Sequence, residues 1–293
     1  MLTILDGGMG GELIRREATP RGELWSAQAL LDAPDAVREV HDDYIVAGAD
    51  IITTNSYSTI PSYLGKLGLA GRFEELTALA GQIARAAADQ ADRSVLVAGS
   101  LPPLDESFRW DLAPSDDEAM PVYRALVTAL NPFVDLFFCE TMSCIRESVS
   151  ALMAARDRAP DKPRYVSWTL DEQPGRGLRS GETIADAVAA VADLDVSGLL
   201  FNCTSPEAIS EGLAELATLT RLPFGAYPNR LSIPAGWTLD NEVPTGLRND
   251  LDVASYCQYT EHWAQLGASI IGGCCGIGPE YIKALQHSTK LKS

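Results

Sequence analysis

Three cysteines have the residue type and the spacing to hold a metal ion. Cys274 and Cys275 form the centre of the sequence GGCCG at 272–276, which follows a largely apolar run. Cys203 ends a similar apolar run, GLLFN at 198–202. Adjacent thiols between glycines suit ordinary packing poorly, whereas three thiolates at the ends of two strands suit a zinc ion that keeps one coordination position open. The sequence therefore predicts a zinc site of the catalytic kind.

Other interpretations of the cysteines stay open at this point. Neighbouring cysteines can form a strained vicinal disulfide or remain inert, but the flanking glycines and the third cysteine favour a metal. No Cys-x-x-Cys or His-x-x-His pattern offers a competing ligand set. Alternation along a strand would point Cys139 away from Glu140. We expect structural roles for Cys139, Cys144 and Cys257, and no ligand role for His41, His262 and His287, which lie in helix-like segments.

Two carboxylates, Asp6 and Glu140, end apolar runs of their own. A carboxylate pair can act as general acid and base, as in glycosidases, or it can bind an ammonium group. Because three thiolates are expected nearby, we favour the ammonium role. Capping of backbone amides is the structural alternative for each carboxylate.

The glycine-rich sequence GGMGG at 7–11 has a rival interpretation as a phosphate-binding loop. It lacks the Lys-Ser/Thr pair of a P-loop, and its glycine spacing does not fit a dinucleotide site well. We expect these glycines to allow a tight turn and a close approach of the backbone to a small ligand.

Short apolar, β-branched runs alternate with helix-like segments along the chain. This alternation is typical of an α/β fold with parallel strands and right-handed crossovers. Eight such units predict a single (β/α)8 TIM barrel, with a doubly wound open sheet as the rival. The expected strands are Thr3–Asp6, Asp50–Asn55, Val95–Ser100, Val134–Glu140, Arg164–Leu170, Gly198–Cys203, Pro223–Tyr227 and Ser269–Cys274. The expected helices include Asp35–Ala47, Phe73–Ala91, Asp117–Leu130, Ile145–Arg158, Thr183–Asp193, Pro206–Thr218 and Val253–Leu266.

Barrel active sites form where the carboxyl ends of the strands meet, so the cysteines and carboxylates are expected at one mouth. Two long loops should lie near it. The stretch 231–249 follows the seventh strand and is rich in Pro and Gly, and we expect it to lie over the mouth. The stretch 101–115 contains Phe108 and Trp110, which are expected either to close over a ligand or to pack locally.

Composition narrows the class of protein. The chain has 293 residues, of which 46% are hydrophobic, and this suits one barrel domain over residues 1–293. A formal net charge of −17 disfavours nucleic-acid partners. No apolar run approaches the roughly 18 residues that cross a bilayer, and the first residues lack the features of a signal peptide. We therefore expect a cytoplasmic protein with neither membrane nor nucleic-acid partners.

At its strand ends the chain resembles the zinc-dependent homocysteine S-methyltransferases, a family that includes betaine–homocysteine and S-methylmethionine–homocysteine methyltransferases. The resemblance runs nearly end to end, and the cysteine motifs are its most specific part. The matching motifs are DGGMG at 6–10, ADIITTN at 49–55, ET at 140–141, NC at 202–203, YPN at 227–229 and GGCCG at 272–276. Gly11, Ile277 and Tyr281 depart from a common Thr, Thr and His, which leaves the methyl donor and the acceptor open.

The resemblance implies a role for each part of the mouth. The implied zinc ligands are Cys203, Cys274 and Cys275. The implied or expected substrate contacts are Asp6 and Glu140 to the amino group of homocysteine, the backbone of Gly7 and Gly8, Trp25 in the donor pocket, and Asn55, Asn202 and Tyr227 near their strand ends.

The implied reaction is zinc-dependent transfer of a methyl group from a sulfonium donor to the thiolate of homocysteine, giving methionine. The sequence LWSA at 24–27 resembles the S-methylmethionine branch, and S-adenosylmethionine and dimethylsulfoniopropionate are further sulfonium candidates. A betaine-type donor, a selenocysteine-type acceptor, and a non-catalytic zinc- or thiol-binding protein on the same barrel are the alternatives. A hydrolase that uses only the two carboxylates is a remote one. A monomer or a homodimer is expected.

Overall fold

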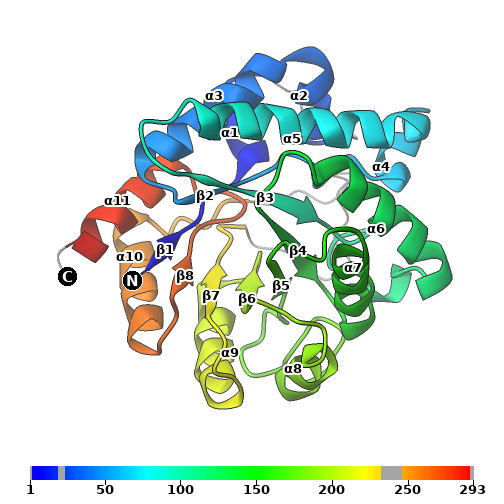
Figure 1. The fold of residues 1–293 in the computed structure, drawn as a ribbon. Helices are drawn as coiled ribbons and strands as arrows, with labels where there is room; N and C mark the ends of the chain where they lie inside the picture. Colours follow the sequence, from blue (N-terminus) through cyan, green and yellow to red (C-terminus); the bar gives the residue numbers. More distant parts are fainter. Residues whose placement is uncertain (1, 19–23, 232–245, 291–293) are drawn as a thin grey trace.

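Eight parallel strands form the barrel that the sequence predicts. The computed structural model describes residues 2–18, 24–231 and 246–290, and Figure 1 shows its strands surrounded by helices. The strands follow the order β1-β8-β7-β6-β5-β4-β3-β2 along the sheet. A parallel bridge between Leu5 and Ile51 joins the two ends of the sheet. The strands are β1 (Thr3–Ile4), β2 (Ile51–Thr53), β3 (Leu96–Leu101), β4 (Leu136–Met142), β5 (Arg164–Trp168), β6 (Gly198–Asn202), β7 (Phe224–Tyr227) and β8 (Ile270–Ile271).

The strands are buried on both faces, as is usual for parallel sheets. Leu5, Phe138 and Ile270 belong to a small apolar cluster inside the barrel. Residues that point outward pack against the helices in a much larger cluster, which includes Cys139. Alternation along β4 therefore sends Phe138 and Glu140 into the barrel and Cys139 away from it, as the sequence predicts.

Helices cover the outside of the barrel, and all seven expected helices are present with ends shifted by at most two residues. Local sequence explains such ends: α3 starts with Pro34 and stops before Gly48, whose φ of 110° few other residues adopt. The helices are α1 (Met9–Arg15), α2 (Ala27–Asp32), α3 (Pro34–Ala47), α4 (Pro61–Gly65), α5 (Phe73–Asp89), α6 (Asp116–Leu130), α7 (Ile145–Arg158), α8 (Ile184–Val191), α9 (Pro206–Leu219), α10 (Val253–Gln265) and α11 (Pro279–Lys290). Within the described residues, no helix combines the length and apolar character that a membrane crossing requires.

The last strand is shorter than predicted, because the glycines after it leave the strand ladder. An added Cβ at Gly272 would lie 2.4 Å from the Cβ of Leu5, so the backbone passes close to β1 there. The N–H of Gly272 donates to the carbonyl of Ala226 (3.1 Å), and that of Gly273 donates to the carbonyl of Asp6 (2.9 Å). This segment is thus tied to both neighbouring strands, and it carries the cysteine pair to the barrel mouth.

Much of the loop expected over the mouth, residues 232–245, lies outside the described residues. Its two described ends meet. Leu231 and Leu247 form an antiparallel bridge, and the N–H of Arg248 donates to the carbonyl of Arg230 (2.8 Å). Both leucines line the cavity in the mouth, so the described ends of this loop form part of its wall.

Candidate metal centre and substrate site

The three cysteines of interest lie together at the mouth. The sulfur atoms of Cys203, Cys274 and Cys275 are all within 4.8 Å of one another, and those of Cys203 and Cys275 are 3.8 Å apart. Tetrahedral zinc with Zn–S bonds of about 2.3 Å places its sulfur ligands about 3.8 Å apart. All six cysteines are free thiols, so the vicinal disulfide is absent here. The cluster fits a metal ion in both spacing and donor type.

Backbone hydrogen bonds fix the cysteine segments to β7 and to the loop that follows it. The N–H of Cys203 donates to the carbonyl of Tyr227 (3.2 Å), and that of Cys274 to the carbonyl of Pro228 (2.8 Å). The carbonyl of Cys275 accepts from the N–H of Arg230 (2.8 Å). Because β7 lies between β6 and β8 in the sheet, it connects the cysteine that follows β6 to the pair after β8.

Gly7 and Gly8 bring the chain against the cysteine segment. An added Cβ at Gly8 would lie 2.7 Å from the carbonyl oxygen of Cys274, and one at Gly7 would lie 2.2 Å from that of Ile277. The N–H of Gly8 donates to the carbonyl of Ile277 (3.0 Å), and the hydroxyl of Tyr44 donates to the same oxygen (3.0 Å). The close approach that the glycines allow is therefore, in this structure, an approach to the segment that carries the cysteine pair.

The two carboxylates that the sequence singles out are buried and line the same cavity as the thiols. Asp6 accepts hydrogen bonds from the N–H (2.7 Å) and the hydroxyl (3.2 Å) of Thr53. Glu140 accepts one from the hydroxyl of Ser100 and another from that of Tyr227 (3.1 Å). Each carboxylate is thus held in one orientation by partners from a neighbouring strand or from across the barrel.

Burial disfavours the ionised form of both carboxyls and so raises their pKa values. It raises the pKa of Asp6 to about 8, and the charge of Glu140 adds to this effect against the hydrogen bonds from Thr53. Burial also raises the pKa of Glu140 to about 7, although the hydroxyls of Ser100 and Tyr227 oppose the rise. A bound cation would supply the missing countercharge and return the carboxyls to their ionised form. The pair is therefore suited to an ammonium group.

The thiols and carboxylates share one cavity of about 750 Å³. Two amino-acid-sized molecules fit within such a volume. Of the predicted site residues, those that line the cavity are Asp6, Gly7, Gly8, Trp25, Asn55, Glu140, Cys203, Tyr227, Cys274 and Cys275. Phe108 also lines it, whereas Trp110 is 47% exposed on the outer surface and does not.

Asn202 is the predicted site residue that the structure keeps out of the cavity wall. Its Oδ1 accepts from the N–H of Thr141 (2.8 Å) and from the hydroxyl of Ser167 (2.8 Å). Its Nδ2 donates to the hydroxyl of Thr141 (2.8 Å). These bonds occupy the amide and support Thr141, so Asn202 shapes the wall from behind.

Backbone strain gathers around the cavity. Six non-glycine residues in the described chain have a positive φ, and four of them line the cavity. These four are Trp25 (49°), Phe108 (67°), Thr141 (61°) and Cys203 (50°). A left-handed backbone at such residues costs about 1–2 kcal/mol each and persists where the surroundings enforce it, often at functional sites. The strain thus gathers in the wall of the same cavity that holds the thiols and carboxylates.

Sequence reasoning missed several residues that complete the site. Thr53 and Ser100 hold the two carboxylates, and Asn229 places its Nδ2 3.8 Å from the sulfur of Cys203. The available signal was position, because each lies at or just after the carboxyl end of a strand. The three histidines lie in α3, α10 and α11 and do not line the cavity, as expected.

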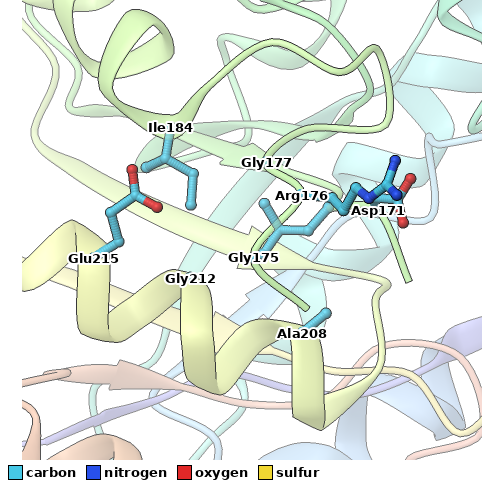
Figure 2. A pocket seen from close by; sticks show the side chains of 9 residues that line it. Asp171, Gly175, Arg176, Gly177, Ile184, Ala208, Gly212 and Glu215 are labelled. Carbon is cyan, nitrogen blue, oxygen red and sulfur yellow. The ribbon is translucent and has the colours of Figure 1, made fainter. Parts of the chain in front are cut away.

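A second hollow is too small to be the site. Figure 2 shows Ala208, Gly212 and Glu215 on α9, with Ile184 beside Glu215 and the loop Gly175–Gly177 nearer to Ala208. The hollow measures about 10 Å³, which is room for about one water molecule. No cysteine lines it. The chemistry of the described chain therefore belongs to the large cavity.

The fold and the site define a (β/α)8 barrel enzyme with a cysteine cluster in its mouth that could hold a metal ion. The sequence pattern of the family described as homocysteine S-methyltransferase matches residues 3–289. The chain belongs to the homocysteine S-methyltransferase family, and it is a methyltransferase.

Individual relatives agree with this assignment. A homocysteine S-methyltransferase of Escherichia coli (strain K12) is 32% identical over 301 residues, covering 97% of this chain and 94% of that protein. A selenocysteine Se-methyltransferase of Brassica oleracea var. italica is 30% identical, covering 97% and 87%. The crystal structure of the metallated form of the homocysteine methyltransferase MmuM from Escherichia coli superimposes with a TM-score of 0.82 at 31% identity, covering 98% of this chain and 96% of that one.

Proposed function

We propose that this enzyme transfers a methyl group from a sulfonium donor, with S-methylmethionine as the first candidate, to the thiolate of homocysteine, with zinc as its cofactor. The product is methionine, and the chain acts as one homocysteine-binding barrel domain. The observation that carries the proposal is the juxtaposition in one cavity of three thiols at zinc spacing and two buried carboxyls. Homocysteine carries the matching groups, a thiol and an ammonium.

Cys203, Cys274 and Cys275 would hold the zinc. Zinc in such a site supplies a Lewis acid that keeps a substrate sulfur in its thiolate form at neutral pH. The remaining thiols, Cys139, Cys144 and Cys257, lie outside the cluster. Burial raises the pKa of Cys139 and of Cys144, so these two stay protonated and inert.

Asp6 and Glu140 would bind the ammonium group of homocysteine and so set the direction in which its thiol points. Both carboxylates are fixed by their own hydrogen bonds, so little ordering is left to occur on binding. Gly7 lines the cavity beside Asp6, whereas the N–H of Gly8 is already used by Ile277. Of these two glycines, Gly7 is therefore the better candidate for a backbone contact to substrate.

The donor would lie against Trp25 in the same cavity. An aromatic ring attracts a cationic methyl group by roughly 0.5–2 kcal/mol. The homocysteine sulfur gains the methyl group, and the electron pair of the broken C–S bond stays on the donor sulfur. Because the product is a neutral thioether, no residue has to protonate the leaving group. A thioether is a much weaker base, and so a better leaving group, than the tertiary amine that glycine betaine would release, which favours a sulfonium. The selenocysteine Se-methyltransferase relative makes a selenium acceptor the second candidate.

The first experiment measures bound zinc per chain and methionine formation from homocysteine with four donors: S-methylmethionine, S-adenosylmethionine, dimethylsulfoniopropionate and glycine betaine. About one zinc per chain and turnover with a sulfonium are the expected results. Zinc without turnover on homocysteine or selenocysteine would contradict methyl transfer and favour a non-catalytic thiol-binding protein. Turnover that survives removal of the metal would contradict the zinc site. Sedimentation of the same preparation tests the monomer or homodimer that we propose.

A further inference from the structure

The wall of the large cavity carries more acidic than basic side chains. Two arginines line its described part, Arg15 and Arg230. Arg15 already forms an ion pair with Glu12, and its side chain is 63% exposed. Arg230 is the other permanent positive charge of this wall. The acidic residues that line the cavity are Asp6, Glu12, Glu140 and Glu280.

The side chain of Arg230 is held in place by three contacts. An added Cβ at Gly276 would lie 2.8 Å from the Cβ of Arg230, so the side chain starts directly beside the glycine that follows Cys275. Its Cζ lies 5.5 Å from the centre of the Tyr281 ring, which is a cation–π distance. Its Nε and Nη2 both donate to the carbonyl of Arg248 (3.2 and 3.1 Å). The guanidinium thus has a fixed position in the cavity wall.

Arg230 has no anion of its own in the described part of the chain, where its contacts are to a carbonyl and a ring. The acids around Arg248 pair with Arg248 itself, Glu207 and Asp250 at 2.7 Å each. Asp252 caps α10, and the hydrogen bonds of that cap lower its pKa more than the charge of Arg230 does. A guanidinium presents a fork of N–H donors that matches a carboxylate. Arg230 is therefore suited to an anion that enters the cavity.

We propose that Arg230 binds the carboxylate of the methyl donor and so restricts the donor to sulfonium compounds that carry a carboxylate. The inference rests on the proposed function. Homocysteine carries its ammonium and carboxylate groups on one carbon, so an acceptor held at Asp6 and Glu140 keeps its carboxylate close to them. The partners of these two acids lie on β2, β3 and β7, whereas Arg230 contacts Gly276 and α11. Arg230 is thus assigned to the second substrate.

Two opposite charges of the donor are then recognised separately. Trp25 attracts the sulfonium methyl group, and Arg230 binds the carboxylate at the other end of the donor chain. Two parallel N–H···O bonds fix direction as well as position. Arg230 therefore orients the donor so that its methyl group faces the sulfur of the acceptor.

The test compares S-methylmethionine with its primary amide, which keeps the sulfonium and ammonium groups but has no carboxylate charge. Arg230→Met keeps an unbranched apolar stem beside Gly276 and removes the guanidinium. It should lower kcat/KM for S-methylmethionine about 10- to 100-fold, while kcat/KM for the amide and the KM for homocysteine stay unchanged. Arg230→Lys should recover part of the loss, because it keeps the charge without the fork. Dimethylsulfoniopropionate and its amide form a second pair of probes with the same expected result.

Arg15→Met is the matched control, because it removes the cavity arginine that is already paired. It should change the ratio of kcat/KM for acid and amide by at most about fivefold, the size of an exposed charge effect. An unchanged ratio in Arg230→Met would overturn the proposal, as would a rise in the KM for homocysteine in place of the donor effect. If Arg230→Met does not fold, the ratio in Arg230→Lys decides alone.

Calorimetric titration of S-methylmethionine and its amide gives a readout that does not need turnover. A wild type that prefers the carboxylate form through Arg230 but transfers no methyl group contradicts the proposed reaction and leaves the carboxylate site standing. A wild type that methylates homocysteine equally well from acid and amide overturns the carboxylate site and leaves the proposed reaction standing. A wild type that neither binds nor uses any of these compounds overturns both.

Discussion

The two sides of the barrel mouth carry different functional groups, thiols on one and carboxylates on the other, and position them by different contacts. On the cysteine side, side chains from β6 and from the segment after β8 are positioned by backbone hydrogen bonds and by glycines that admit the chain at close range. On the carboxylate side, Asp6 and Glu140 are positioned mainly by side-chain hydroxyls, together with the backbone N–H of Thr53. Thiolates must be left free to bind a metal, whereas buried carboxylates need donors and, finally, a cation.

This difference indicates where the thiol and the ammonium group of the proposed substrate would each be recognised. In the proposed function, the cysteine side would recognise the thiol, and its described cysteines include no group that selects an amino acid. The carboxylate side would recognise the ammonium group, and its described residues include no group that activates sulfur. Damage to one side should therefore leave the function of the other measurable, and the following variants use this separation.

The largest effect is expected from Cys274→Ser, which removes a proposed zinc ligand. Bound zinc and methyl transfer should both fall by more than the 10- to 100-fold that loss of an outer-shell partner typically costs. Metal analysis and a methionine assay measure the two. Cys257→Ser is the control, because Cys257 lies on α10 outside the cluster. Equal activity of the two variants would contradict the assignment of the cysteine side.

The next effect is expected from Glu140→Gln, which breaks the carboxylate side alone. A hydrogen bond to a charged group contributes about 1.5–3 kcal/mol, so the KM for homocysteine should rise by roughly 10- to 100-fold while zinc content stays unchanged. Steady-state kinetics with 4-mercaptobutanoate, which is homocysteine without its amino group, provides the control. A loss of the same size with both thiols would show that Glu140 does not bind the ammonium group.

Gly8→Ala tests whether the close backbone approach on the cysteine side supports stability and zinc binding. The new Cβ would lie 2.7 Å from the carbonyl oxygen of Cys274, and a backbone atom cannot easily move aside. We expect the free energy of unfolding to fall by about 1–3 kcal/mol and zinc affinity to fall with it. Gly11→Ala is the matched control, since its nearest atom would be 3.9 Å away. Urea unfolding that finds both variants equally stable would contradict the tight approach.

Much of this mouth can be predicted from sequence, and the reasons differ between its two sides. Apolar β-branched runs recur through the chain, so eight strands and their carboxyl ends can be located without a structure. The cysteines and the two carboxylates follow from these ends, because barrel topology brings strand ends together. Adjacent cysteines between glycines are also an unusual pattern, so the sequence alone indicates them as candidate metal ligands.

The remaining features depend on the direction of side chains and on backbone geometry, which sequence patterns do not specify. Asn202 was expected to contact substrate, but its amide turns to Thr141 and Ser167. Thr53, Ser100 and Asn229 lie in the same kind of strand-end position, and only their partners show that they hold a carboxylate or approach a sulfur. The positive φ of Cys203 likewise has no signature in the residue type.

The smallest effect concerns stability and comes from Asp6→Asn in the metal-free protein. Burial raises the pKa of Asp6 to about 8, while in the unfolded chain this carboxyl ionises near its ordinary pKa of about 4. Its contribution to stability is therefore complete below pH 4 and is lost as the pH rises through 8. The Asn side chain stays uncharged throughout.

The variant should consequently gain stability relative to the wild type as the pH rises from 7 to 9, by about 1–2 kcal/mol, while the loss of one Thr53 hydrogen bond adds an offset that does not change with pH. Urea unfolding at several pH values measures the difference. Glu106→Gln is the control, in the loop after β3, where Lys66 pairs with the carboxylate. A difference between Asp6→Asn and wild type that stays constant with pH would mean that Asp6 is ionised throughout. The carboxylate side would then carry its negative charge before any ammonium group arrives.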